Sequence, residues 1–319
     1  MPSPPEAPPP ARLRILLRTA RAQSDEWRAA LAQALPEADI AVWPDVPFAP
    51  DYVVAWKPSA EFFNRVANPK AIFNLGAGVE ALLRLPNLPP DVPVIRLEDA
   101  GMAQQMAQYV TLAVLAAHRQ RNAYASAQYE GRWASLPTVP SARFTVGLLG
   151  LGVLGCACAD ALRGLGYPVL GWSREPKQVP GVESFSGTDA LPQLLSRSRV
   201  LVCLLPATPH TIDLLDAARL ALLPRGAHVV NVSRGDIVVD HALIAALDAG
   251  HLAGATLDVF RTEPLPPAHP FWHHPRIAMT PHISAATQVA EAVAQVAAKI
   301  RLLERGQAVT GMVDRALGY

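Results

Sequence analysis

The sequence predicts an α/β protein with two doubly wound parallel sheets, each in its own domain. From Leu13 onward, short β-prone apolar runs alternate with helical patterns, which is typical of parallel sheets covered by helices on both faces. The chain has 319 residues and is 50% hydrophobic, and a chain of that length forms two compact domains more often than one. We therefore expect two α/β domains.

Five apolar runs in the first third of the chain predict one small sheet. The segment before them, residues 1–10, is mostly proline and is expected to be a disordered leader outside the fold. The predicted strands are Leu13–Leu17, Ile40–Trp43, Tyr52–Trp56, Ala71–Leu75 and Val94–Leu97.

Six further runs predict the second sheet, and six is the strand count of a dinucleotide-binding sheet. These strands are Phe144–Leu149, Pro168–Trp172, Val200–Leu204, His228–Val232, Ala255–Val259 and Ile277–Thr280.

Two long helical patterns flank the second series of strands. They run from Gly101 to about Arg121 and from Ala285 to about Arg305, and we expect both to cross between the domains. The closing segment Val309–Tyr319 is too short to stand alone, so it should pack back on the first domain. We therefore expect residues 11–99 and 287–319 to form a discontinuous substrate-binding domain and residues 100–286 to form a dinucleotide-binding domain.

The composition favours a small-molecule partner. Lysine plus arginine number 28 against 27 aspartates and glutamates, so there is no basic stripe for nucleic acid and no charge suited to a membrane surface. Three cysteines do not make a disulfide framework, and no signal-peptide pattern opens the chain, so we expect a cytoplasmic protein. His269, His273 and His274 have no partners at ligand spacing, so no metal site is expected.

A glycine-rich turn follows the first strand of the second series. Gly150, Gly152 and Gly155 form a GxGxxG pattern with Val153 and Leu154 between them, after a predicted strand and at the start of a helix. Glycines allow the tight turn and the close backbone approach, and the exposed N–H groups at the positive end of the helix then bind a pyrophosphate. In this context the turn predicts a dinucleotide site.

The end of the next strand predicts the choice of dinucleotide. About 20 residues past the glycines, an acidic residue would bond the ribose 2′-hydroxyl of NAD. The sequence instead has Ser173 and Arg174, a hydroxyl and a planar cation suited to a 2′-phosphate, and Lys177 adds charge nearby. NADP(H) is therefore preferred, with NAD(H) possible.

An arginine, a carboxylate and a histidine follow three later strands, at the sheet edge where ligands bind in open α/β folds. Reduction of a 2-keto acid needs a cation that orients the carboxylate and an acid that protonates the nascent alkoxide. Arg234 and His282 fit these two roles. Glu263 would hydrogen-bond the imidazole, fix its orientation and favour its protonated form.

Together these segments are similar to the ordered motifs of the D-2-hydroxyacid dehydrogenase family, over nearly the whole chain. Within the family, the sequences around Asn74–Val79, Gln104–Val110, Trp172–Arg174 and Val313–Arg315 most resemble the glyoxylate/hydroxypyruvate reductase branch. The resemblance implies a flavodoxin-like substrate domain, a Rossmann dinucleotide-binding domain and a homodimer. It also implies the NADPH-dependent reduction of small 2-keto acids, glyoxylate and hydroxypyruvate, with Arg234, Glu263 and His282 as the catalytic residues.

The resemblance extends the predicted site. It implies that Asp258 lies near the nicotinamide and that the backbone amides of Gly76, Ala77, Gly78 and Val79 bind the substrate carboxylate. Trp56 either lines the pocket or belongs to the core. The other residues expected at the cofactor are Leu205, Pro206, Thr211, Val232 and Ser233, together with Arg234 and His282.

Three interpretations of the function stay open. The first is the reduction of glyoxylate and hydroxypyruvate with NADPH. The second is a sister dehydrogenase for phosphoglycerate, a bulkier 2-keto acid or formate, and the third is a dinucleotide-sensing scaffold without turnover. The complete set of Arg234, Glu263 and His282 disfavours the scaffold. The helical stripe Met102, Met106 and Tyr109 is interpreted as core or subunit contact, with cofactor contact as the minority reading.

Overall fold

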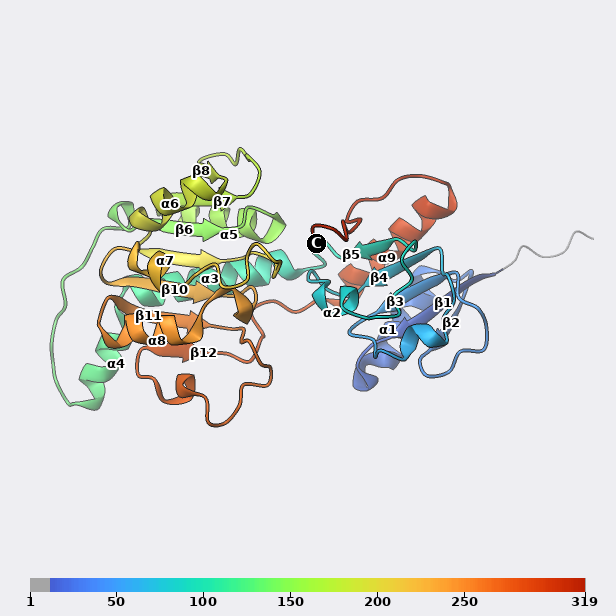
Figure 1. The fold of residues 1–319 in the computed structure, drawn as a ribbon, viewed down its shortest axis with the longest axis horizontal. Coiled ribbons are helices and arrows are strands. Elements are labelled where there is room, and N and C mark those ends of the chain that lie inside the picture. Colours follow the sequence, from blue (N-terminus) through green and yellow to red (C-terminus); the bar gives the residue numbers. More distant parts are fainter. Residues whose placement is uncertain (1–11, 319) are drawn as a thin grey trace, which may run out of the picture. The chain divides into compact units, whose positions relative to one another are not determined.

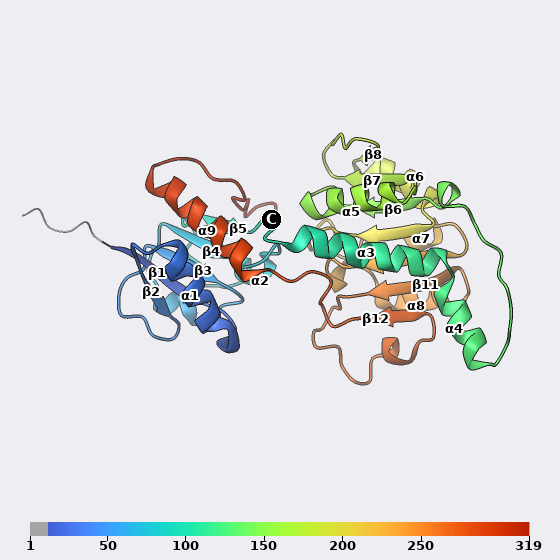
Figure 2. The same cartoon turned by 180° about the vertical axis from the view of Figure 1, so that it is seen from behind.

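The computed structural model describes residues 12–318, so the proline-rich leader lies outside the described residues. The chain divides into two compact units. One unit contains residues 12–100 and 287–318, and the other is Gly101–Ala286 (Figures 1 and 2).

The first unit is built on a five-stranded parallel sheet with the order β2-β1-β3-β4-β5. Strands β3 and β4 are buried along their whole length, as expected for central strands covered on both faces. The strand bounds are β1 Leu13–Arg18, β2 Ala38–Val42, β3 Tyr52–Ala55, β4 Ala71–Asn74 and β5 Val94–Arg96.

Helices α1 (Ser24–Ala34) and α9 (Val289–Glu304) pack against each other on one face of this sheet (Figure 2). The short helix α2 (Glu80–Leu83) contributes Leu82 to a buried cluster on strand residues such as Val53 and Ile72. After α9 the chain returns to the sheet edge, where Met312 bridges antiparallel to Ile95 in β5. The edge strand is thereby covered.

The second unit is built on a seven-stranded parallel sheet with the order β12-β11-β10-β9-β6-β7-β8. The chain moves outward from β6 to β8 and then crosses back to β9, so the winding reverses between β6 and β9. The strand bounds are β6 Val146–Leu149, β7 Val169–Ser173, β8 Glu183–Ser186, β9 Val200–Cys203, β10 Ala227–Asn231, β11 Leu252–Leu257 and β12 Ile277–Met279.

Alternating strand residues supply two separate cores in this unit. In β9, Val200 and Val202 pack into the cluster that contains α3 and α5, whereas Leu201 and Cys203 pack into the cluster that contains α6, α7 and α8. This is the period of two that a strand buried on both faces requires. The helices are α3 Met102–His118, α4 Arg121–Tyr129, α5 Val153–Gly164, α6 Leu191–Arg197, α7 Ala217–Ala221 and α8 Asp240–Asp248.

The fold class predicted from the sequence is confirmed, but two details were wrong. The second sheet has a seventh strand, β8, which has no apolar run because it is a short edge strand whose residues are all partly or fully exposed. The long helices do not cross between the units, since α3 lies wholly in the second unit and α9 wholly in the first. No helix within residues 12–318 is long and apolar enough to cross a membrane.

Candidate active site

The loops that carry the predicted cofactor and catalytic residues of the second unit follow the carboxyl ends of its strands. The glycine turn follows β6 and the segment from Leu204 follows β9, so the two flank the point where the strand order reverses (Figure 1). Ligands of open α/β sheets bind in the crevice at this point.

The three glycines of the turn differ in the space beside each of them. Gly150 has a φ of 112°, in the region that disfavours other residues. A Cβ at Gly155 would lie 2.0 Å from the Gly150 carbonyl oxygen, so the start of α5 packs directly on the turn. A Cβ at Gly152 would meet no described atom within 4 Å. The three glycines therefore serve a turn, an open approach and a close packing contact, and the turn fits a pyrophosphate.

The end of β7 presents two cations beside this turn. The Ser173 hydroxyl is buried and donates to the Glu175 carbonyl at 2.7 Å. Arg174 is exposed and its Nε lies 3.3 Å from a Glu175 carboxylate oxygen. The Lys177 ammonium donates to the Leu151 carbonyl at 3.2 Å, inside the glycine turn. Two cations, one of them paired with Glu175, therefore follow the end of β7, the position that meets the ribose in dinucleotide-binding folds.

The loop after β9 is closed by its own side chains. Thr211 is buried, and its hydroxyl donates to the Pro206 carbonyl at 2.6 Å and accepts the Thr208 N–H at 2.8 Å. Leu205 is buried, and Pro206 is partly exposed. The Thr211 hydroxyl therefore fixes the shape of the loop, and direct contact with a cofactor is not required to explain it.

Asn231, at the end of β10, shapes the turn that carries Arg234. Its amide nitrogen donates to the Arg234 carbonyl at 2.9 Å, and its amide oxygen accepts the Ser233 N–H at 3.2 Å and the Ser233 hydroxyl at 2.9 Å. A Cβ at Gly235 would lie 2.0 Å from the Phe260 carbonyl carbon. The Arg234 turn therefore packs directly on the loop after β11.

Glu263 and His282 are hydrogen-bonded to each other at the same end of the sheet. The imidazole Nδ1 of His282 lies 2.8 Å from Oε2 of Glu263, and Oε1 accepts the Phe260 N–H at 3.1 Å. The side chain of His282 is 42% exposed and that of Glu263 is 31% exposed, so the pair faces solvent rather than the core. His282 also has a φ of 55°, which is uncommon for a residue with a side chain.

Asp258 is fully buried just after β11. Its carboxylate accepts the Thr280 hydroxyl at 2.5 Å and the N–H groups of Ile283 and Ser284 at 2.8 Å each. Its backbone carbonyl accepts the His282 N–H at 2.8 Å. These contacts make Asp258 an anchor of the loop that carries His282.

Trp56 and the loop 76–79 belong to the first unit. Trp56 is partly exposed and its ring covers Gly76, where a Cβ would lie 2.3 Å from a ring carbon. The buried Asn74 side chain donates to the carbonyls of Gly76 and Gly78 at 3.0 and 2.9 Å. Asn74 thus fixes the loop from beneath, while the Val79 side chain is buried in the core.

Several positioning residues were missed by sequence reasoning. Asn231 and Asn74 are polar side chains at the carboxyl ends of the buried strands β10 and β4, and that placement is the signal that could have identified them. Thr280 follows the partly exposed strand β12, so burial of its strand gave no such signal. Among the described residues, no cluster of three His, Cys, Asp or Glu side chains is arranged to hold a metal ion. His269 and His274 instead contact two different aspartates, Asp240 and Asp248.

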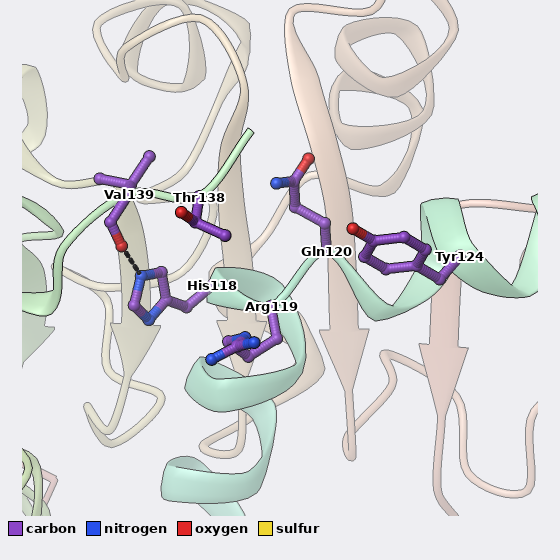
Figure 3. A pocket seen from close by; sticks show the side chains of 6 residues that line it. All are labelled: His118, Arg119, Gln120, Tyr124, Thr138 and Val139. Carbon is purple, nitrogen blue, oxygen red and sulfur yellow. Dashed lines mark hydrogen bonds between the residues drawn. The ribbon is translucent and has the colours of Figure 1, made fainter. Parts of the chain in front are cut away.

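A small pocket lies elsewhere, between the end of α3 and the segment before β6 (Figure 3). The His118 ring contacts the Tyr167 hydroxyl at 2.7 Å and the Val139 carbonyl at 2.6 Å, which ties the long segment after α4 to the helix. None of the predicted site residues lines this pocket.

Comparison with known proteins defines the family. The family model for the D-isomer specific 2-hydroxyacid dehydrogenase, NAD binding domain, matches residues 111–284. The chain is 44% identical over 302 residues to a glyoxylate/hydroxypyruvate reductase A of Serratia proteamaculans (strain 568), an alignment that covers 93% of this chain and 96% of the relative.

Two solved structures are similar along both units. A D-isomer specific 2-hydroxyacid dehydrogenase of Xanthobacter autotrophicus Py2, in complex with NADPH and MES, has a TM-score of 0.93 at 42% identity, covering 97% of this chain and 100% of that one. An NADPH-dependent glyoxylate/hydroxypyruvate reductase of Sinorhizobium meliloti, in complex with NADP and sulfate, has a TM-score of 0.90 at 34% identity with the same coverage.

The strand order, the glycine turn and the Glu263–His282 pair define a dinucleotide-dependent oxidoreductase. The chain belongs to the D-isomer specific 2-hydroxyacid dehydrogenase family.

Proposed function

We propose that this enzyme reduces small 2-keto acids with NADPH, glyoxylate to glycolate and hydroxypyruvate to glycerate. The observation that carries the proposal is the contact of His282 Nδ1 with Glu263 at the carboxyl end of the second sheet. This contact leaves Nε2 as the ring nitrogen that can face a substrate. The named relatives at 44% identity support the choice of substrates.

Each residue of the site has a distinct role in this reaction. Bound NADPH supplies the hydride for the keto carbon. His282 transfers the proton from Nε2 to the carbonyl oxygen, and Glu263 holds the ring and stabilises its cationic form before the transfer. The Arg234 guanidinium binds the substrate carboxylate and stabilises the negative charge that develops on the carbonyl oxygen.

The preference for NADPH is supported by the residues at the end of β7. Ser173 and Arg174 stand where an acidic residue would repel a 2′-phosphate, and Lys177 adds a second cation on the glycine turn. The structures of two relatives that carry NADPH or NADP agree with this preference. The pyrophosphate is bound by the turn Gly150–Gly155, at the N-terminus of α5.

The substrate carboxylate also contacts the backbone amides of residues 76–79 in this proposal. Asn74 accounts for two carbonyls of that loop, those of Gly76 and Gly78, by donating to both. Trp56, which covers Gly76, limits the size of the acid that the loop accepts.

The proposal is tested by His282→Ala. Removing the proton donor should lower kcat by about 10²- to 10⁴-fold, the usual contribution of a general acid, while the Kd for NADPH changes little. NADPH and NADH oxidation are followed with glyoxylate, hydroxypyruvate, pyruvate and phenylpyruvate. An equal loss of NADPH binding in His282→Ala, or turnover of phenylpyruvate alone in the parent enzyme, contradicts the proposal.

We further propose a homodimer, which the family resemblance implies, and a cytoplasmic location, which the low cysteine content favours. Sedimentation of the purified chain as a monomer at micromolar concentration would contradict the dimer.

A further inference from the structure

A line of three side chains links helix α3 to the loop that carries His282. The Tyr109 hydroxyl lies 2.5 Å from the Thr280 hydroxyl, which donates to Oδ1 of Asp258 at 2.5 Å. Tyr109 is partly buried in the middle of α3, and Asp258 is completely buried. The expected role of Tyr109 was core or subunit contact, so this polar contact was not foreseen.

The direction of the hydrogen bonds follows from the number of protons. Thr280 has one hydroxyl proton and gives it to the carboxylate, so Tyr109 is the donor to Thr280. Burial is the largest influence and raises the pKa of Tyr109; the hydrogen bond with Thr280 lowers it by less, and the charge of Asp258 adds a still smaller increase. The phenol therefore remains protonated, and thus a donor, across the neutral range.

Asp258 connects these hydrogen bonds to the backbone around His282 and so restricts its conformation. One carboxylate accepts the N–H groups of both residues that follow His282, and the Asp258 carbonyl accepts the N–H of His282 itself. His282 has a left-handed backbone conformation, which persists only where the surroundings impose it. Here the carboxylate and carbonyl oxygens of Asp258, which accept the N–H groups of residues 282–284, impose that conformation.

Helix α3 holds the same loop at a second point. Gln105, one turn before Tyr109, donates to the Ala286 carbonyl at 2.8 Å and accepts the Ala286 N–H at 3.2 Å. Residues four apart lie on one face of a helix. The segment from Thr280 to Ala286 is therefore attached to one face of α3 at both of its ends, with His282 between them.

We propose that Tyr109 and Thr280 are positioning residues for the reaction, acting through Asp258 to hold His282 in the orientation that presents its Nε2 to the substrate. The proposal rests on the proposed function of His282 as proton donor. Neither hydroxyl contacts the substrate; both act through the shape of the loop.

The primary test is a double-mutant cycle with Tyr109→Phe and Thr280→Val, variants that remove one hydroxyl each. Tyr109→Phe should lower kcat by about 3- to 10-fold, as expected for the loss of one neutral hydrogen bond. Thr280→Val should lower it by about tenfold or more, because Asp258 then loses a donor. KM for the keto acid and Kd for NADPH should change by less than about twofold, since neither residue is placed at a ligand.

The double variant distinguishes action in series from independent effects. If Tyr109 acts through Thr280, the double variant has the kcat of Thr280→Val alone. Thr280→Ser keeps the hydroxyl and should restore kcat to near the parent value. Multiplied losses in the double variant, or no rescue by serine, overturn the proposal.

Tyr167→Phe is the matched control. Tyr167 is a buried tyrosine of the same unit whose hydroxyl contacts His118, and it belongs to the cluster against which Tyr109 packs. It should leave kcat unchanged, and equal losses in Tyr109→Phe and Tyr167→Phe would overturn the proposal. Hydrogen exchange supplies a readout that does not depend on turnover: amides in 280–286 should exchange faster in Tyr109→Phe and at the parent rate in Tyr167→Phe.

His282→Ala in the same assay separates the two proposals. If that variant keeps full turnover, the proposed function is wrong, whatever Tyr109 does. If it is inactive while Tyr109→Phe has the parent kcat and the parent exchange rates, only the positioning proposal is wrong.

Discussion

Glu263 holds His282 with one carboxylate oxygen and its own loop with the other. Oε2 lies 2.8 Å from the imidazole Nδ1, and Oε1 accepts the Phe260 N–H at 3.1 Å. The loop after β11 therefore sets the orientation of the imidazole ring through Glu263. That loop is in turn in van der Waals contact with the Arg234 turn at Gly235, so the catalytic groups share one support.

This relationship predicts the effect of Glu263→Gln. The amide keeps the size of the side chain but cannot stabilise a cationic imidazole by charge. We expect kcat to fall by about tenfold or more, a part of the 10²- to 10⁴-fold that a general acid contributes, with the Kd for NADPH unchanged. Stopped-flow measurement of NADPH oxidation checks this, and a parent-like kcat would show that the carboxylate is dispensable.

The glycine turn predicts two opposite alanine phenotypes. Gly152→Ala adds a methyl group where no described atom lies within 4 Å, so the melting temperature should stay within about 2 °C while the Kd for NADPH rises at least tenfold, because the methyl group occupies the path of the pyrophosphate. Gly155→Ala places a methyl group 2.0 Å from the Gly150 carbonyl and should destabilise the protein itself. Calorimetry and NADPH fluorescence titration separate the two, and identical phenotypes would contradict the assignment.

Arg174→Ala tests the cofactor preference. A charge-assisted hydrogen bond is worth about 1.5–3 kcal/mol, so the Kd for NADPH should rise by tenfold or more while the Kd for NADH barely changes. Arg163→Ala is the control, since that arginine lies at the far end of α5 and pairs with Asp160 at 3.3 Å. A constant NADPH to NADH ratio in Arg174→Ala would refute the role.

His228 predicts an acid-sensitive stability. Burial in β10 lowers the pKa of His228 to about 4 from its usual 6.5, so between these values the unfolded chain binds a proton that the folded chain does not. The contribution of His228 to the free energy of unfolding has its full value above pH 6.5. It falls by roughly 3 kcal/mol in total as the pH drops toward 4. His228→Leu should flatten this decline in urea titrations, whereas the exposed His273→Gln should keep it. An unchanged slope in His228→Leu counts against the prediction.

The fold was largely predictable because most strands are continuous apolar runs with turn residues between them. Strand β8 was not predicted because it has no apolar run. As an edge strand it is held by backbone pairing to β7 and needs no apolar side chains of its own. The helix limits also escaped prediction. Gln120 has a left-handed backbone conformation that separates α3 from α4. No glycine or proline stands at this position to signal the break.

Part of the site was predictable for the same reason. The contact between Glu263 and His282 follows from two loops at one sheet edge, which strand order alone dictates. The left-handed conformation of His282 and the contact of Tyr109 with Thr280 do not follow, because they depend on how α3 packs against a loop in which Thr280 lies 171 positions from Tyr109 in sequence. The positions of Arg234 and Asp258 at the cofactor stay predictions.

The bridge between Ile95 and Met312 has a consequence for biosynthesis. The unit Gly101–Ala286 is one uninterrupted stretch of chain. It can therefore complete its internal contacts while the ribosome is still translating the 3′ end of the message. Residues 12–100, although made first, lack this contact at β5 until Met312 emerges. The usual order of vectorial folding is thereby inverted in this chain.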